Sequence, residues 1–155
     1  MNSADLQRFI DSHHVQATIL LMDQHTPTVP EAAKALGVEA WQIIKSLVFL
    51  IKDEPVLVIN NGEARIDPRK LADYLAVGRG RIKFAAPDQA LEITGYVVGS
   101  MPPFGHKQKL RTVIDSSVGS LETIYGGGGD INAMMRLTAA ELLRVTSAEA
   151  TRISE

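Results

Sequence analysis

The chain of 155 residues contains no cysteine. This absence excludes a disulfide framework, a thiolate nucleophile and any cysteine-ligated metal site. No apolar run approaches the roughly 18 residues that a membrane span needs. Residues 1–14 have neither the basic nor the apolar region of a signal peptide. We therefore expect a cytoplasmic protein that does not enter a membrane.

The motifs of several common enzyme classes are also missing. The four histidines have no HExxH spacing, no GxSxG sequence is present, and the tetraglycine at 126–129 is not followed by the Lys-Ser/Thr of a phosphate-binding loop. We expect neither a metal nor a cofactor. His25 and His106 stay open as general bases, although a loop histidine is more often simply solvated.

Length and composition favour one globular domain over residues 1–155. Apolar residues make up 45% of the chain and charged residues 22%, which is ordinary for a folded domain. A chain of this size buries roughly 70% of the surface that its unfolded form exposes. Global disorder is therefore excluded.

The charge is unevenly distributed. The net charge of −2 by itself argues against a nucleic-acid binder, but residues 65–111 hold nine basic and four acidic side chains, so they carry +5 and the remainder carries −7. Such an asymmetry suits a phosphate-bearing ligand. Before any motif is considered, a solvated mixed surface is the favoured interpretation.

Capping signals and hydrophobic periodicity predict an α+β fold. Helices are expected over 4–13 with Ser3 as N-cap, over 30–37 after a Thr28 cap, from an Asp67 cap to near Gly78, over 87–91, and over 137–146 with a capping box at Thr138 and Glu141. Strands are expected over 17–22, 45–52, 55–60, 81–84, 96–99, 112–118 and 122–126, and near Arg152. The strands at 45–52 and 55–60 form a hairpin, with Asp53 and Glu54 between them. The elements do not follow a regular βαβ period, which indicates one mixed sheet.

Two local features suggest chemistry. Lys45 precedes a buried apolar strand, so it either extends to solvent from an edge or points into a pocket with a lowered pKa. The segment 94–105, TGYVVGSMPPFG, combines glycines with two prolines, and its amides near Gly99 and Ser100 either converge on an oxyanion or form only a tight structural loop. The four glycines at 126–129 suit either a close ligand or a surface turn.

Four segments in one order resemble the YbaK / prolyl-tRNA synthetase-associated domain family of free-standing aminoacyl-tRNA editing domains. Residues 31–49 resemble the family's AA-x-x-LG…K-[ST]-LVF segment, and 94–105 resemble its TGY-x-x-G…P-x-G loop. Residues 112–118 and the run 122–146, with its glycines and its LTAAEL helix, complete the resemblance. The joint occurrence of the first two segments is specific, whereas the glycine run alone is weak.

The resemblance implies a single α+β domain with a mixed, partly barrel-like β-sheet flanked by helices. It implies hydrolysis of the ester that joins a wrong amino acid to the terminal adenosine of a tRNA, commonly proline tRNA. The partner would be the acceptor end of an aminoacyl-tRNA, with prolyl-tRNA synthetase as a second candidate. The oligomeric state stays open.

The resemblance also assigns roles to residues of this chain. Lys45 corresponds to the catalytic or substrate-anchoring lysine, and Gly99 and Ser100 correspond to amide donors to the substrate carbonyl. The rest of the pocket is implied to comprise Leu20, Met22, Met101, Pro102, Pro103, Gly126, Gly127 and Gly128. The acceptor stem is expected to contact Arg65, Arg69, Lys70, Arg79, Arg81 and Lys83.

The chain departs from the cysteine-removing branch of that family at three places. Gly127 stands where that branch has serine, Met22 stands where it has tyrosine, and its aspartate falls at or near Met134. These changes make the pocket more apolar. A small aliphatic or hydroxylated amino acid is then as plausible a target as cysteine.

Two alternatives to a trans-editing deacylase remain at this stage. One is a non-catalytic module that binds tRNA or a synthetase, and the other is an enzyme that acts on a different small aminoacyl or nucleotide ester. The presence of Lys45 and of the glycine-proline loop favours an enzyme.

Overall fold

The computed structural model describes residues 1–26 and 28–155 and confirms the α+β class. The strands are β1 (Ala17–Leu21), β2 (Ile44–Ile51), β3 (Glu54–Asn61), β4 (Ile82–Phe84), β5 (Arg111–Asp115), β6 (Thr123–Gly127), β7 (Ala133–Thr138) and β8 (Glu149–Thr151). The helices are α1 (Ser3–Ser12), α2 (Val29–Leu36), α3 (Pro68–Leu75), α4 (Pro87–Thr94), α5 (Ser116–Gly119) and α6 (Ala139–Thr146), with 3₁₀ turns η1 (Ala40–Gln42) and η2 (Arg79–Arg81). Within these described ranges no helix has the length and apolar character needed to cross a bilayer.

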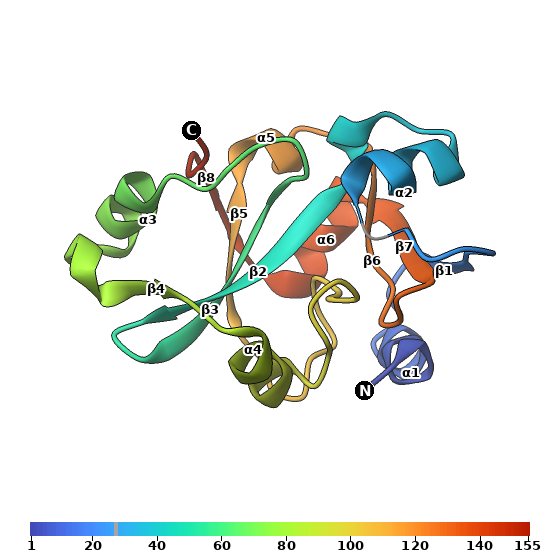
Figure 1. Ribbon diagram of the computed structural model, residues 1–155, viewed down its shortest axis with the longest axis horizontal. Coiled ribbons are helices and arrows are strands. Elements are labelled where there is room, and N and C mark those ends of the chain that lie inside the picture. Colours follow the sequence, from blue (N-terminus) through green and yellow to red (C-terminus); the bar gives the residue numbers. More distant parts are fainter. Residues whose placement is uncertain (27) are drawn as a thin grey trace.

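The strands form two sheets rather than the single sheet expected. One is antiparallel with the order β1-β7-β6, and the other is mixed with the order β4-β2-β3-β5-β8. Figure 1 shows the three-stranded sheet beside one end of the larger sheet, and α3 with β4 at the opposite end. A single bridge between Ile43 and Tyr125 joins the two sheets. Among the described strands neither sheet closes into a barrel.

The hairpin of β2 and β3 is confirmed, but its turn lies one residue earlier than expected. Lys52 and Asp53 both have positive φ, 51° and 69°, as a two-residue type I′ turn requires. Ile51 therefore pairs with Glu54, and Lys45 pairs with Asn60. A turn at Asp53-Glu54 would have placed Gly62 opposite Lys45 instead.

The two faces of β2 pack into different parts of the core, because successive side chains of a strand alternate. Ile44 and Val48 belong to the larger cluster, which also holds Met101, Ala90 and residues of α1 and α6. Phe49 and Ile51 belong to a second cluster around Leu71 of α3. The sheet thus separates the α4 side of the molecule from the α3 side.

Helix ends follow their capping residues, with one correction. Thr28 caps α2, Asp67 caps α3 and Thr138 caps α6, as expected. The prediction of Ser3 as the first cap is wrong, because the Asn2 side chain accepts hydrogen bonds from the amides of Ala4 and Asp5. Helix α3 ends at Leu75, short of Gly78, and α4 continues to Thr94.

The predicted strand over 96–99 is wrong. Gly95 and Gly99 adopt φ of 87° and 96°, outside the range of a strand, and the Ser100 amide donates to the Val97 carbonyl in a turn. The predicted strand over 112–118 ends early, because Asp115 caps the short helix α5. The last strand lies at 149–151, just before Arg152.

Strand β7 was not predicted. Its odd-numbered residues are buried and its even-numbered ones are more exposed, which is the period-two pattern of a strand with one face in the core. The pattern was missed because the segment adjoins the capping signal of α6. This strand places Met134 opposite Leu20 of β1.

Candidate active site

A cavity of about 250 Å³ lies along the part of β2 that no strand covers on one side. Strand β4 pairs only with residues 49–51, and beyond it the Ala85 amide donates to the Val48 carbonyl at 3.0 Å. Residues 44–47 therefore border the cavity. The opposite walls come from α2, from α4 with the loop after it, and from the end of β6.

The cavity brings together four of the residues predicted from the sequence, namely Lys45, Gly99, Met101 and Gly127. These residues come from β2, from the glycine-proline loop and from the end of β6. Most of the other lining side chains are apolar, including Val29, Ala32, Phe84, Ala90, Val98 and Met134. The arrangement is typical of a pocket for a small apolar group with few polar contacts.

Lys45 is the one charged residue among the described residues that line the cavity. Its Nζ lies 3.3 Å from the Ala64 carbonyl oxygen, which also accepts a bond of 2.9 Å from Asn60 Nδ2. Within the described residues no carboxylate forms an ion pair with it. Burial lowers the pKa of Lys45, and the nearby Arg65 lowers it further. A half-buried cation without a counter-ion is suited to bind an anionic or carbonyl oxygen.

The glycine-proline loop presents free amides near the cavity, those of the lining residues Val98, Gly99 and Met101. The Ser100 amide and Oγ both donate to the Val97 carbonyl, at 3.1 and 2.8 Å. In contrast, the amides of Gly99 and Met101 have no acceptor among the described residues. Unpaired amides beside a cavity are available to a ligand. The Ser100 amide is already occupied within the turn.

The glycines after β6 allow the chain to pass very close to this loop. A Cβ at Gly127 would lie 2.6 Å from the Met101 carbonyl carbon and 2.9 Å from the Ser100 oxygen. The Gly129 amide donates to the Ser100 carbonyl at 3.0 Å. The serine that the cysteine-removing branch has at this place would therefore collide with the loop in this chain.

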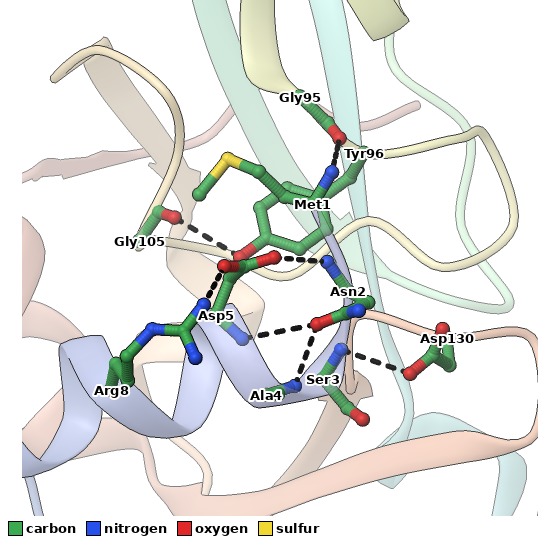
Figure 2. A network of polar contacts seen from close by, with 10 residues as sticks. All are labelled: Met1, Asn2, Ser3, Ala4, Asp5, Arg8, Gly95, Tyr96, Gly105 and Asp130. Atoms are coloured by element: carbon green, nitrogen blue, oxygen red, sulfur yellow. Dashed lines mark hydrogen bonds and ion pairs between the residues drawn. The ribbon is translucent and has the colours of Figure 1, made fainter.

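The N-terminal segment makes hydrogen bonds to the glycine-proline loop and to the residue that follows the glycine run (Figure 2). The Met1 ammonium donates to the Gly95 carbonyl at 2.7 Å, and the Ser3 amide donates to Asp130 Oδ2 at 2.9 Å. The Tyr96 hydroxyl donates to the Gly105 carbonyl at 3.2 Å. The first two contacts join the N-terminus to the start of the glycine-proline loop and to the residue after the glycine run, and the third joins the two ends of the loop to each other.

Several predicted pocket residues do not line this cavity. Pro102 and Pro103 are buried within the loop, and Gly126 packs against the side chain of Ile44. Of the others, Leu20 and Met22 are half-buried at the end of β1, Gly128 is packed against Ala133, and Ser100 is buried.

The two histidines considered as general bases, His25 and His106, are not among the residues that line the cavity. His25 is exposed. The Nε2 of His106 is 2.8 Å from the Pro102 carbonyl oxygen, and burial lowers the pKa of its imidazole although that contact opposes the shift. His106 therefore supports the loop from inside the protein.

The predicted tRNA-binding cations gather around α3, η2 and β4. All but Lys70 are exposed, and Lys70 is partly buried because its Nζ donates to the Ser154 carbonyl at 2.7 Å. Lys83 directly precedes Phe84, which lines the cavity and is 60% exposed. The basic segment therefore reaches the rim of the cavity along β4.

Sequence reasoning missed three residues of this region. Ser46 and Phe84 line the cavity, and Asn60 lies opposite Lys45. Ser46 could have been proposed from the sequence, because it directly follows Lys45 in the strand. Asn60 required the correct hairpin register, and Phe84 required the position at which β4 ends.

The fold and the cavity define an α+β domain with a small, mostly apolar pocket, one lysine and free main-chain amides at the edge of a sheet. A sequence model of the aminoacyl-tRNA editing domain matches residues 23–145, and the chain belongs to this family. The predicted family membership is thus confirmed.

Relatives and solved structures agree with this assignment. The chain is 31% identical over 116 residues to the uncharacterized protein YwhH of Bacillus subtilis, covering 74% of this chain and 72% of YwhH. It is 34% identical over 108 residues to a proline–tRNA ligase of Limosilactobacillus fermentum, covering 66% of this chain but only 18% of the ligase. A crystal structure of a protein proposed as a trans-editing enzyme for prolyl tRNA synthetase superimposes with a TM-score of 0.90 at 29% identity, covering 99% of this chain and 96% of that one.

Proposed function

We propose that this protein is a trans-acting deacylase that hydrolyses the ester of a mischarged amino acid on tRNA, with proline tRNA as the favoured carrier. The proposal is carried by one observation: in a chain of the editing-domain family, a lysine without a carboxylate partner and free amides of the glycine-proline loop border the same small cavity. Such an enzyme acts where charged tRNA is used, so we assign it to the cytoplasm.

The proposed reaction needs few side chains, because an ester is already more reactive than an amide. Water attacks the ester carbonyl carbon, and the carbonyl oxygen becomes an oxyanion that accepts hydrogen bonds from the amides of Gly99 and Met101. One such donor supplies about 2.7–4 kcal/mol in other enzymes. The bond from the carbonyl carbon to the ribose oxygen then breaks, and the ribose oxygen takes up a proton.

Lys45 and the geometry of the pocket supply the rest. The ammonium holds the carbonyl, the ribose or the adjacent phosphate, and fixing the ester beside the amides contributes through positioning. No aspartate or glutamate is among the cavity-lining residues described, so the neighbouring ribose hydroxyl is the candidate that assists proton transfer. Selection against proline rests on pocket size, for which one methylene counts for about 1–3 kcal/mol.

The composition of the pocket predicts its preferred amino acid. Met134 lies in the wall beside Gly127, which offers no hydroxyl, so a thiol or hydroxyl of the substrate that packs against this part of the wall would lose hydrogen bonds at a cost of about 1–3 kcal/mol. Alanyl-tRNA is therefore expected to be cleared faster than the cysteinyl and seryl esters on the same proline tRNA. Initial rates at equal concentration test this, and clearance of the cysteinyl ester ten times faster, about 1.4 kcal/mol in its favour, would refute it.

The basic segment predicts salt-dependent binding of tRNA. Each phosphate contact releases counterions, so affinity should fall steeply with salt, and Arg79→Glu with Arg81→Glu should weaken it at low salt. Arg8→Glu with Arg136→Glu changes the net charge equally, on exposed residues of α1 and β7, and serves as the control. Equal losses in both variants, or binding that does not respond to salt, would show that the segment is not the tRNA face.

A panel of charged tRNAs tests the function itself. Release of free amino acid from one misacylated tRNA, with the correctly charged tRNA spared, is expected for an editing deacylase. The alternative of a non-catalytic module that binds tRNA or prolyl-tRNA synthetase predicts binding to the panel without release. Release from a small nucleotide or aminoacyl ester, with every tRNA spared, would point to a different esterase.

A further inference from the structure

Two buried side-chain oxygens have no hydrogen-bond partner among the described residues, Ser46 Oγ and Asn60 Oδ1. Buried polar atoms are rarely left unpaired, because burial removes their hydrogen bonds to water and an unpaired group does not replace them. Asn60 lies opposite Lys45 and is fully buried. Ser46 is different, because it lines the cavity.

The strand geometry directs Ser46 toward this cavity. Its side chain lies on the same face of β2 as Ile44 and Val48, which pack in one cluster with the cavity-lining residues Met101 and Ala90. The Oγ is thus a hydrogen-bonding group in an otherwise apolar part of the wall.

The main-chain carbonyl of Ser46 also faces the cavity, at the edge of β2 that β4 does not cover. The Val48 carbonyl accepts from Ala85 on the β4 side, and main-chain groups two residues apart in a strand point to the same side. Ser46 itself is paired only with Ile59 of β3. Its carbonyl oxygen therefore faces the edge that borders the cavity, near its Oγ.

The charges in the cavity define what these oxygens can bind. Lys45 is the one charged residue of the described lining, and it is a cation. The α-amino group of an aminoacyl ester is largely protonated near neutral pH, since the unperturbed pKa of an α-amino group is about 7.7–8.0. An ammonium group that enters this cavity finds no carboxylate and is repelled by Lys45, so it requires neutral oxygens.

We infer that Ser46 binds the α-ammonium group of the aminoacyl ester, with its Oγ as one acceptor and its carbonyl oxygen as a second. This inference rests on the proposed function and adds a residue that recognises the α-ammonium group of the substrate. Holding the amine at β2 keeps it away from Lys45 and turns the ester carbonyl toward the amides of Gly99 and Met101. An acyl ester without the amine does not use this contact.

The test compares two esters on the same proline tRNA, alanyl and propionyl, which differ by the amine. Ser46→Ala should lower kcat/KM for the alanyl ester at least about tenfold, as expected for loss of a hydrogen bond to a charged group. It should leave kcat/KM for the propionyl ester within about twofold of the wild type, a change well below that expected for any lost bond. Ser46→Thr keeps the hydroxyl and should retain the preference for the amine.

Two controls separate binding from structure. Thermal melting of Ser46→Ala should show an unchanged or higher Tm, because the variant removes a buried hydroxyl that has no partner. Thr26→Ala removes another hydroxyl from the cavity lining and should not change the ratio of the two rates. A lowered Tm with equal losses on both esters would mean that Ser46 is structural.

The remaining outcomes distinguish this inference from the proposed function. If the wild-type protein hydrolyses the alanyl ester and Ser46→Ala lowers both rates equally or neither, the inference about Ser46 is wrong and the deacylase stands. If the wild-type protein hydrolyses neither ester nor any misacylated tRNA, the proposed function is wrong and the inference is wrong with it.

Discussion

Replacing Lys45 by alanine is expected to lower deacylation at least about a hundredfold, which corresponds to roughly 2.7 kcal/mol of transition-state stabilisation. The reason is that Lys45 is the only charged residue in the described lining of the cavity and its ammonium has no carboxylate partner among the described residues. Single-turnover rates on a misacylated tRNA, measured beside the Tm of the variant, test this expectation.

Controls separate the charge of Lys45 from its shape. Lys45→Met keeps most of the side-chain volume without the ammonium and should be as inactive as the alanine variant. Lys34→Ala removes an exposed lysine of α2 and should leave the rate unchanged. A folded Lys45→Ala protein with full activity would remove Lys45 from the mechanism, and a large drop in Tm with a proportionate loss of activity would mean that the lysine is structural.

A single methyl group at Gly127 is expected to abolish most activity. The new Cβ of Gly127→Ala would overlap the Met101 and Ser100 main chain, and main-chain atoms move only if the loop moves. The amides of Gly99 and Met101 would then leave their places beside the cavity. We expect a loss of activity similar to that of Lys45→Ala, with unfolding free energy lowered by about 1–3 kcal/mol as in other overpacked sites.

Gly126→Ala is the matched control for this prediction. Its nearest neighbours are side-chain atoms of Ile44 at 3.3 Å, which can shift by a few tenths of an ångström. Its rate and Tm should therefore stay near those of the wild type. If Gly127→Ala were as active as Gly126→Ala, the close approach of β6 to the loop would have no role in the site.

Local sequence signals predicted much of the fold. The caps at Thr28, Asp67 and Thr138 placed three helix starts correctly, because a capping side chain needs only the next few residues. The buried strands β2 and β3 were equally clear from their apolar residues. The turn between them was not, since Lys52 and Asp53 adopt positive φ without a glycine. That detail decided which residue lies opposite Lys45.

The sequence predicted which segments of the chain form the site, but not the contacts between these segments. Lys45, the glycine-proline loop and the glycine run were all singled out, and the structure brings one or more residues of each to the same cavity. Which amides are free depends on the turn at Val97–Ser100, and the role of Gly127 depends on a contact with Met101 across the sequence. Such contacts between distant segments leave no local signal in the sequence.

The most direct test of the deacylase is multiple turnover on alanyl-tRNA of the proline isoacceptor, with substrate in large molar excess over the protein. We expect free alanine to accumulate well beyond the amount of protein present, prolyl-tRNA to be spared, and Lys45→Ala to abolish the release. Binding of the charged tRNA without any release of alanine above the spontaneous rate would contradict this expectation and would identify the domain as a binding module.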